Sequence, residues 1–381
     1  MIKVTGVLDF VNKINKKEDI IMRKLATVRK ISNIKSIENA NAIEVAFVDG
    51  WECVCKKNEF KIGDKIVYIE IDSIVPERPE FEFLRSRKFR VRTIKLRGQI
   101  SQGLILPLSV LPPNKEYKIN DDVTEILGIT KYDPQAEQEN KLFAQKTNKT
   151  NPLIKFFMKF KLFRRFYIKP KGGGFPAWIS KTDEERIQNK VGMFKTEKEL
   201  GTKFVVTEKI DGQSGTFFLE KVGRKYKFGV CSRNVNITND PNHNGSYWKI
   251  AKQLDIENVL RQLIGKEDRI VLQGEIVGEG IQGNKYRIKG YDFYAFNLIY
   301  PNRKIPTKEM TKMLKPFNIK SVMIIEENFE LKNDIAEMVD YAKGNSLLLP
   351  SQKREGVVIR NFEKNISFKV INPDFLLAEK D

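Results

Sequence analysis

Short segments in which apolar and polar residues alternate fill residues 22–110, and they leave few folds open to this part of the chain. The alternation runs over 43–47 and again over 51–55, with Asp49-Gly50 between the two segments. An Asp-Gly pair in this position is typical of a β-hairpin. Three further segments of this kind span 65–75, 88–98 and 102–108. Several short strands in so few residues predict a small β-barrel such as the OB-fold.

Positive charge is concentrated in one of these predicted strands. Basic residues stand at Arg85, Arg87, Lys88, Arg90, Arg92, Lys95 and Arg97. Phe89 and Val91 share one face of the strand, which directs Arg90 and Arg92 to the other face. The apolar alternation shifts by one residue further along, and this shift predicts a β-bulge near Arg92-Thr93. A barrel strand with a basic outer face can follow a nucleic-acid backbone. We therefore predict that Arg90, Arg92, Lys95 and Arg97 contact nucleic acid. The alternative is a solvated strand edge protected by its charge.

Residues 131–175 have the composition of a linker. The first part is polar and rich in turn residues, and the second, from 153, mixes aromatic with basic residues. This second part has the character of a membrane-surface helix or of a helix packed between domains. We favour packing, because the run is internal and ends in the Gly-rich segment 170–174, which predicts a flexible joint. The expected domains are therefore 1–130, an OB-fold, and 176–381.

Strand-like and helix-like segments alternate irregularly after residue 176. Apolar strand patterns occupy 203–210, 214–222, 225–232, 268–278, 291–300, 355–361 and 366–371. Amphipathic patterns at 248–265 and 331–344 predict helices. This mixture predicts an α+β domain of mostly antiparallel sheets with flanking helices.

The charge balance and the scarcity of cysteine narrow the function. The chain has 68 Lys and Arg against 49 Asp and Glu, a net charge of +19, which favours nucleic acid or an anionic membrane surface as partner. A lysine-rich proteome would give the same excess. Three cysteines and one histidine supply neither a disulfide framework nor a zinc site. No segment resembles a signal peptide or the roughly 20 apolar residues of a membrane span, so we expect a cytoplasmic protein without a membrane partner.

The segment VVTEKIDGQSG contains the residues most suggestive of chemistry. Lys209 stands at the end of a predicted strand, and Asp211-Gly212 forms a turn that would present its amine to a bound nucleotide. A lysine attacks phosphorus only as the free amine, so neighbouring charges or a metal must lower its pKa from about 10.4. Asp211 is placed to help hold such a metal. Alone, the pattern also fits an ordinary surface lysine beside a turn.

Further short motifs follow Lys209 in a fixed order. They are Ser232-Arg233-Asn234, Gly274-Glu275, Phe296 in YDFYAFNL, Glu355-Gly356 and Lys369 in SFKVI. Taken singly, Phe296 suits a core and the two glutamates suit exposed strands. Taken in order, they resemble the motifs of the covalent nucleotidyltransferases, the superfamily of ATP-dependent ligases and mRNA capping enzymes. The forms EKIDG, GIQG, DFYAFN and EGVVI resemble RNA ligases most, and so does a basic N-terminal barrel followed by FPAWISKTDEERIQN.

This resemblance implies roles for the residues near the phosphates. Lys209 would be the nucleophile that becomes adenylylated, and Lys369 would bind the α-phosphate and offset its charge. Asp211 and Glu355 would coordinate a metal through water, and Glu275 would act at the metal or at the ribose. Carboxylate and phosphate oxygens suit Mg²⁺ or Mn²⁺.

The resemblance also implies a site for the nucleoside of ATP. Arg233 would contact the ribose or the acceptor end, and Phe296 would stack on adenine. Glu208 and Gln188 are further candidates for the adenine pocket.

Two positions depart from the family pattern. Most ligases carry two lysines in the last motif, whereas Ser367 precedes Lys369 here, and Lys364 or Lys353 would have to supply the missing charge. Asn297 also replaces a common Asp in DFYAFN.

The resemblance implies an ATP-dependent RNA ligase, which we expect to be a monomer that joins 3′-hydroxyl and 5′-phosphate ends. Its RNA would be a nicked duplex or an RNA/DNA hybrid, sealed through lysyl-AMP and an AMP-capped 5′ end, as in RNA repair. One alternative is a GTP-dependent capping enzyme, disfavoured because too few residues follow Lys369 for a C-terminal OB-fold. Another is a nucleic-acid-binding protein that has lost catalysis.

Overall fold

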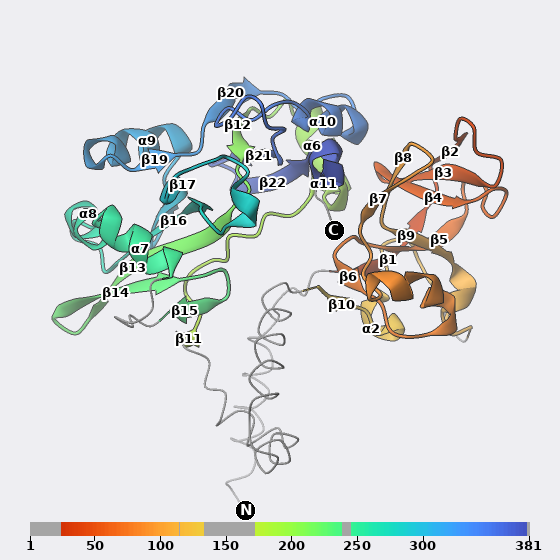
Figure 1. Ribbon diagram of the computed structural model, residues 1–381, viewed down its shortest axis with the longest axis horizontal. Helices are drawn as coiled ribbons and strands as arrows, with labels where there is room; N and C mark the ends of the chain where they lie inside the picture. Colours follow the sequence, from red (N-terminus) through yellow and green to blue (C-terminus); the bar gives the residue numbers. More distant parts are fainter. Residues whose placement is uncertain (1–23, 114, 133–171, 238–244, 379–381) are drawn as a thin grey trace, which may run out of the picture. The chain divides into compact units, whose positions relative to one another are not determined.

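The computed structural model describes residues 24–113, 115–132, 172–237 and 245–378, and the chain forms two compact units (Figure 1). The first unit is Met1–Gln138 and the second is Glu139–Asp381. The basic aromatic run from 153 lies outside the described residues. The predicted joint at its end is wrong for Gly172–Gly174, because these glycines form strand β11 and pair with β15.

Short antiparallel strands build the first unit, as the alternation predicted. The sheet orders are β1-β5-β9 and β2-β3-β4, while β7 pairs with β8 and β6 with β10. The strands are β1 (Ala26–Lys30), β2 (Asn33–Ser36), β3 (Ile43–Val48), β4 (Trp51–Lys56), β5 (Lys65–Ile69), β6 (Ser73–Ile74), β7 (Thr93–Leu96), β8 (Gln99–Gln102), β9 (Leu104–Pro107) and β10 (Thr130–Lys131). The short helices are η1 (Pro79–Arg87), η2 (Leu108–Val110) and α2 (Thr124–Leu127). Alternate residues of β5 enter two separate apolar clusters, so this strand is buried on both faces.

The hairpin predicted from Asp49-Gly50 is confirmed. Strands β3 and β4 pair with Val48 opposite Trp51, and Asp49 and Gly50 both have positive φ, the geometry of a two-residue hairpin turn. Cys53 and Cys55 are buried on one face of β4 and act as small apolar residues.

The continuous basic strand predicted over 88–98 is wrong, and so is its bulge. Lys88 and Phe89 have φ values of 52° and 57°, so the chain turns out of helix η1 through two left-handed residues. The strand β7 begins only at Thr93. Phe89 and Val91 are nonetheless buried, as their apolar character predicted.

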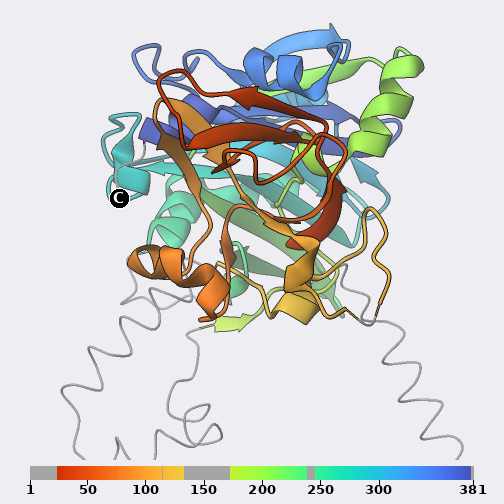
Figure 2. The ribbon, with the colours of Figure 1, turned by 90° about the vertical axis from the view of Figure 1, so that its right-hand side faces the viewer.

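Two antiparallel sheets form the second unit, which is coloured green to blue in Figures 1 and 2. The larger sheet has the order β11-β15-β14-β13-β16-β17-β18, with β19 parallel to β17, and the smaller has the order β20-β12-β21-β22. The larger sheet contains β11 (Gly172–Gly174), β13 (Gln213–Val222), β14 (Lys225–Cys231), β15 (Val235–Ile237), β16 (Arg269–Gly278), β17 (Tyr291–Tyr300), β18 (Arg303–Lys304) and β19 (Lys320–Ser321). The smaller contains β12 (Phe204–Lys209), β20 (Ile324–Phe329), β21 (Gly356–Asn361) and β22 (Ile366–Ile371).

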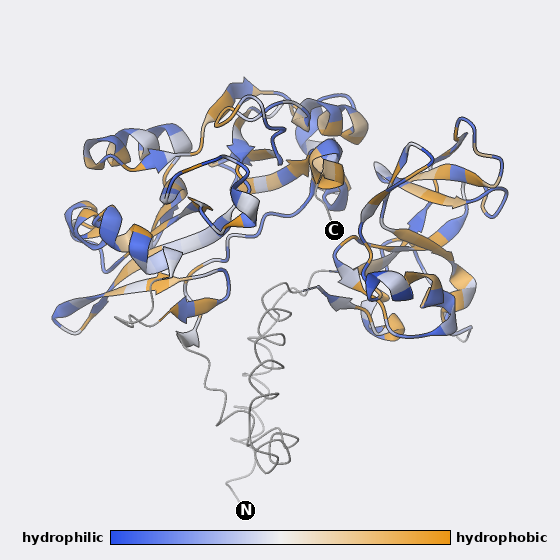
Figure 3. Ribbon diagram, viewed as in Figure 1, coloured by the Kyte–Doolittle hydropathy of each residue, from blue (hydrophilic) through white to orange (hydrophobic). Residues whose placement is uncertain are grey.

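Helices cover one face of each sheet. They are α6 (Val191–Glu199), α7 (Ser246–Gln253), α8 (Ile256–Leu263), α9 (Thr307–Leu314), α10 (Ile335–Ala342) and α11 (Pro373–Ala378), with the short η3 (Ile187–Asn189), η4 (Gln282–Asn284) and η5 (Lys315–Phe317). Apolar residues of α7, α8 and α9 pack on β13, β16 and β17, while those of α6 and α10 pack on β12, β21 and β22. Figure 3 shows hydrophobic and hydrophilic residues mixed along these elements, as half-buried helices and strands require.

The sequence located the main elements of this unit. All seven predicted strands are present. The helix predicted at 331–344 is α10, capped at its start by the Asp334 carboxylate, which accepts a hydrogen bond from the Glu337 N–H. The helix predicted over 248–265 is instead two helices, because Asp255 is left-handed, with a φ of 46°. Among the described residues, no helix is both long and apolar enough to cross a membrane.

Candidate active site

Lys209 lies at the end of β12 and faces a carboxylate from the next strand. Its backbone pairs with Gly356, the first residue of β21, so Glu355 stands beside it. The Lys209 Nζ is 2.6 Å from Glu355 Oε2, and the two side chains are 25% and 15% exposed. Gly356 has a φ of 155°, and a Cβ there would lie 2.2 Å from the Val370 carbonyl oxygen. A glycine at this position therefore lets β21 approach β22 closely behind the ion pair.

The turn after Lys209 brings in Glu275 from the larger sheet. The Gly212 N–H donates a hydrogen bond of 3.1 Å to Glu275 Oε1. A Cβ on Gly212 would lie 2.4 Å from the Ile276 carbonyl oxygen, so only glycine allows the turn to rest on β16. The motif thus joins the two sheets at the site.

Asp211 is held by two residues that the sequence did not single out. Lys285 Nζ lies 2.6 Å from Asp211 Oδ2, and the Asp211 N–H donates to the Tyr286 hydroxyl at 2.9 Å. Both residues follow η4. Their position just after the GIQG motif is the feature of the sequence that could have identified them.

Three carboxylates therefore surround one amine. Burial favours the neutral form of Lys209, but Glu355, Glu275 and Asp211 outweigh it and raise the pKa of Lys209 above its usual value. Burial, opposed by Lys209 but reinforced by Glu355 and Asp211, raises the pKa of Glu275 to about 8. Burial and the Glu355 charge, partly opposed by Lys285 and Lys209, raise the pKa of Asp211 to about 6. The group holds more negative charge than its lysines neutralise.

Further cationic residues lie near Lys209. Lys369 is on β22, and its backbone N–H donates to the Glu185 carbonyl at 2.7 Å. Burial, followed by the charges of Lys209 and Arg186, lowers the pKa of Lys369 to about 7. Arg186 is itself buried and forms a β-bridge with Lys369. The sequence did not identify Arg186, although it belongs to the FPAWISKTDEERIQN segment.

The predicted metal ligands fit a hard cation by their chemistry. Asp211, Glu275 and Glu355 supply carboxylate oxygens. A divalent ion would stabilise the ionised forms of Asp211 and Glu275, whose pKa values are raised in its absence. Within the described ranges, no three Asp, Glu, His or Cys side chains converge closely enough to ligate a metal directly. Their role in metal binding stays a prediction.

Arg233 lies at the margin of this group. Its guanidinium forms an ion pair with Asp183, and both side chains are 41% exposed. The Asp183 charge also acts to raise the pKa of Lys369, against larger opposing effects. The structure thus connects Arg233 to Lys369 through Asp183, while its contact with ribose stays a prediction.

The predicted adenine residues are buried acceptors and one aromatic ring. Glu208 Oε2 accepts the Leu347 N–H at 2.7 Å, whereas Glu208 Oε1 and Gln188 Oε1 are buried without a hydrogen-bond partner among the described residues. Phe296 packs in the apolar cluster that contains Ile210. Each of these buried acceptors could receive a hydrogen bond from a ligand.

The two departures from the family pattern have structural answers. The cation beside Ser367 is Arg360, whose Nε donates to Ser367 Oγ at 3.4 Å. The suggested substitute Lys364 instead pairs with Glu197 at 2.6 Å, and Lys353 is exposed. Asn297 Nδ2 donates to Gln273 Oε1 at 2.8 Å between β17 and β16, which is a role inside the sheet.

The four predicted nucleic-acid residues of the first unit divide into two pairs. Arg90 forms an ion pair with Asp72 at 2.6 Å, and its guanidinium lies 3.5 Å from the Tyr132 ring centroid. Arg90 and Arg92 are both half-buried, so the outward projection predicted for them is limited. Lys95 and Arg97 are exposed on the β7–β8 hairpin.

Known proteins resemble both units. A family model described as an OB-fold domain matches residues 25–108, and one described as RNA ligase matches residues 202–371. None of the curated proteins compared with the chain matches it. These two matches confirm the predicted OB-fold and the α+β ligase unit.

Solved structures of a Naegleria gruberi RNA ligase resemble the whole chain. A variant with AMP and Mn is 34% identical, over 93% of this chain and 98% of that one, with a TM-score of 0.74. The same protein with PPi is 35% identical, with the same two coverages and TM-score. A variant with ATP and Mn is 35% identical, over 94% of this chain and 100% of that one, with a TM-score of 0.75. With this identity across nearly the full length, and with Lys209 set among its carboxylates, the chain belongs to the RNA ligase family.

Proposed function

We propose that this chain is an ATP-dependent ligase that joins RNA 3′-hydroxyl and 5′-phosphate ends through AMP carried on Lys209. The observation that carries the proposal is the Lys209 amine, 2.6 Å from Glu355 and within the field of Glu275 and Asp211. An ordinary surface lysine would not be buried among three carboxylates from two sheets.

The reaction has three displacement steps at phosphorus. The free Lys209 amine attacks the α-phosphorus of ATP, a P–N bond forms, and pyrophosphate leaves. An oxygen of the RNA 5′-phosphate then attacks the AMP phosphorus, and the P–N bond breaks to return the lysine. Finally the 3′-hydroxyl oxygen attacks the 5′-phosphate, a phosphodiester bond forms, the hydroxyl proton is lost, and AMP leaves.

The site explains why the amine rests in its protonated form. Its carboxylates hold the pKa of Lys209 high, so Lys209 must lose a proton before it can attack. Mg²⁺ or Mn²⁺ bound by Asp211, Glu275 and Glu355 would neutralise those carboxylates and so lower the pKa of the lysine. Lys369 and Arg186 would offset the charge of the phosphates. The relatives with ATP or AMP and Mn support this choice of nucleotide and metal.

Two buried acceptors favour ATP over the GTP of a capping enzyme. Glu208 Oε1 and Gln188 Oε1 lack donors among the described residues. The adenine amino group donates hydrogen bonds, whereas the corresponding guanine position is an oxygen that would face these acceptors unfavourably. Stacking of adenine on Phe296 would complete the pocket.

The RNA substrate follows from the family and from the exposed charge of the first unit. We propose a nicked duplex or RNA/DNA hybrid as the substrate of a monomer that acts in RNA repair. Lys95 and Arg97, exposed on one hairpin of an OB-fold unit, would contact its backbone.

The test is covalent labelling. Incubation with labelled ATP and Mg²⁺ or Mn²⁺ should give an acid-labile, alkali-stable adduct that Lys209→Ala removes completely. Lys203→Ala is the matched control, because Lys203 lies directly before the same strand but is exposed and pairs with Glu330. Labelling by GTP would favour a capping enzyme, and no labelling by either nucleotide would favour a non-catalytic binding protein.

A further inference from the structure

A pocket lies at the end of the second unit's sheets, away from Lys209. Its volume is about 460 Å³, and its walls are the β17–β18 and β21–β22 hairpins. Arg360, which lines it, stands four residues along β21 from Gly356, the partner of Lys209. At 3.3 Å per residue this is about 13 Å along the strand. Ser367, which also lines the pocket, stands two residues from Lys369 on β22, so the pocket adjoins the Lys369 side of the site and lies away from Lys209.

The pocket has a positive lining. Arg303, Lys304 and Arg360 contribute cations, and none of the described residues that line it is Asp or Glu. The charge of Arg360 is already offset, because its guanidinium donates a hydrogen bond of 3.1 Å to the carboxylate of Glu184, which does not line the pocket. Arg303 is exposed and its guanidinium lies 4.8 Å from the Tyr300 ring centroid. Lys304 and Arg303 are thus the excess charge of the pocket.

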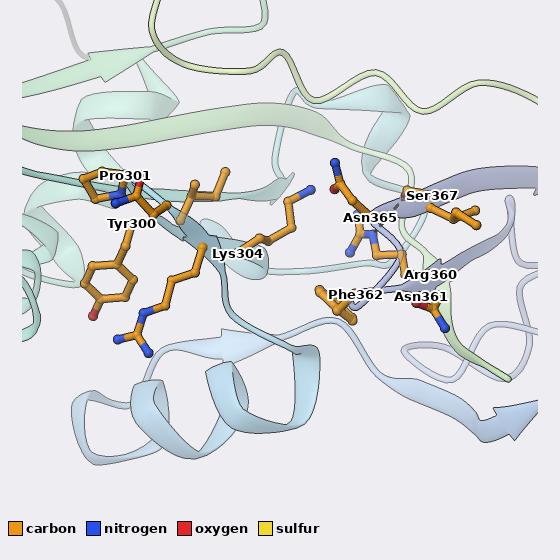
Figure 4. Close-up of a pocket in the computed structure, with 12 residues that line it drawn as sticks. Tyr300, Pro301, Lys304, Arg360, Asn361, Phe362, Asn365 and Ser367 are labelled. Carbon is orange, nitrogen blue, oxygen red and sulfur yellow. Dashed lines mark hydrogen bonds between the residues drawn. The ribbon is translucent and has the colours of Figure 1, made fainter. Parts of the chain in front are cut away.

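Lys304 has no internal partner to explain its position. It is half-buried, yet its ammonium forms no hydrogen bond or ion pair with any residue that the structure describes. Burial and the neighbouring Arg360, only partly opposed by Glu184, lower the pKa of Lys304. Figure 4 shows Lys304 extending toward Asn365, near Arg360 and Ser367. The Asn365 amide likewise makes no hydrogen bond among the described residues, so it is a second donor available to a ligand.

We propose that this pocket binds one nucleotide of the RNA strand through its phosphate, with Lys304 as the principal cation and Asn365 and Arg303 as further donors. A half-buried ammonium beside a like charge is stabilised by an anion, and phosphate accepts several hydrogen bonds at once. The volume lies within the range of small-ligand sites and suits a nucleotide. The proposal rests on the RNA ligase function, and it adds a contact about 13 Å along β21 from Gly356, the strand partner of Lys209.

The decisive variant is Lys304→Met, which keeps the apolar stem and removes the charge. The matched control is Lys308→Met, because Lys308 is exposed on the adjacent α9 and pairs with Glu327 at 3.0 Å. Binding of a labelled nicked RNA duplex would be measured with the full chain at several salt concentrations without ATP. Lys304→Met should weaken binding about five- to tenfold at low salt and reduce the salt slope by about one, while Lys308→Met should leave both unchanged.

Two further measurements keep the outcome specific. Lys304→Arg should retain most of the affinity, and the Lys209 adduct formed from ATP should be unchanged in Lys304→Met. RNA binding like that of the wild type in Lys304→Met would overturn the proposal. Weaker binding of ATP or pyrophosphate in place of weaker RNA binding would overturn it too. Failure of the wild type to form the Lys209 adduct would instead count against the ligase function, which the RNA-binding comparison does not measure.

Discussion

Charged residues serve different purposes in the two units. Around Lys209, three carboxylates and several cations lie largely buried, and burial and mutual interaction displace the pKa values of Lys209, Glu275 and Lys369. In the first unit, Lys95 and Arg97 are exposed on a hairpin, and Arg90 is engaged with Asp72 and Tyr132. Charge in the second unit is therefore arranged around Lys209, the proposed nucleophile, whereas charge in the first is either paired within the unit or exposed.

A count of basic residues in the sequence does not by itself establish a nucleic-acid-binding surface. Seven basic residues between Arg85 and Arg97 suggested one binding strand, but Lys88 and Phe89 turn the chain and Arg90 is paired with Asp72 of the same unit. Only the local fold separates an arginine that binds RNA from one that holds a loop.

The largest expected effect concerns the carboxylates of the second unit. Glu275→Gln and Glu355→Gln should each slow formation of the Lys209 adduct about 100- to 1000-fold, because the site loses charge that would hold the metal and orient the lysine. The measurement is single-turnover adenylylation with labelled ATP. In Glu275→Gln the new amide oxygen would still accept the Gly212 N–H, so the turn should remain in place.

Glu279→Ala is the control for this pair. Glu279 is exposed four residues beyond Glu275, and its backbone N–H, which the substitution keeps, bonds to the Gly290 carbonyl. Its adduct formation should be close to that of the wild type. An equal loss in all three variants, with lowered melting temperatures, would show misfolding and not a catalytic role.

Sequence patterns predicted most of the second unit because its chemistry lies at strand ends. Lys209 ends β12 and Glu355 directly precedes β21, so the pairing of these two strands brings them together, and the Gly212 turn links them to Glu275 on β16 of the larger sheet. Lys285, Tyr286 and Arg186 were missed, because they come from a loop and an extended segment whose paths are set by tertiary contacts. The order of the motifs predicted the candidate residues that the structure brings together, but not the residues that surround them.

The first unit shows the opposite limit of sequence reasoning. The apolar alternation correctly predicted the β3–β4 hairpin and the buried Phe89 and Val91. It failed at Lys88 and Phe89, since positive φ in two bulky residues is rare and has no marker in the sequence. The same is true of Asp255, which divides the predicted helix 248–265.

A moderate effect is expected on the pH dependence of stability in the second unit. The pKa of Glu275 is raised to about 8 and that of Asp211 to about 6, so the folded chain retains protons that the unfolded chain releases. Stability without divalent metal should therefore be greatest below the unfolded values and fall as the pH rises toward 8. Glu275→Gln should reduce the loss between pH 5 and 7 by roughly 2 kcal/mol, which allows for its coupling to Lys209.

Denaturant unfolding at pH 5, 6 and 7 in a chelator would measure this change. Trp178 and Trp248 report on the second unit, and a Trp51→Phe background would remove the signal of the first. The window ends at pH 7 because Lys369, with a pKa of about 7, begins to contribute in the opposite direction above it. If Glu275→Gln lost as much stability between pH 5 and 7 as the wild type, Glu275 would not be the carboxylate responsible for this pH dependence.

The smallest expected effect concerns the exposed hairpin of the first unit. Lys95→Gln combined with Arg97→Asn should weaken RNA binding and flatten its salt slope by up to about two, if each residue contacts one phosphate. Asn suits position 97 because the backbone φ there is 48°. Arg90→Ala is the contrasting variant, since loss of its contacts with Asp72 and Tyr132 should lower the stability of the first unit. Sealing of a nicked duplex should fall in the hairpin variant while the Lys209 adduct forms normally. Loss of both activities would indicate that the unit acts during adenylylation, and unchanged binding at physiological salt would leave the hairpin as a solvated edge.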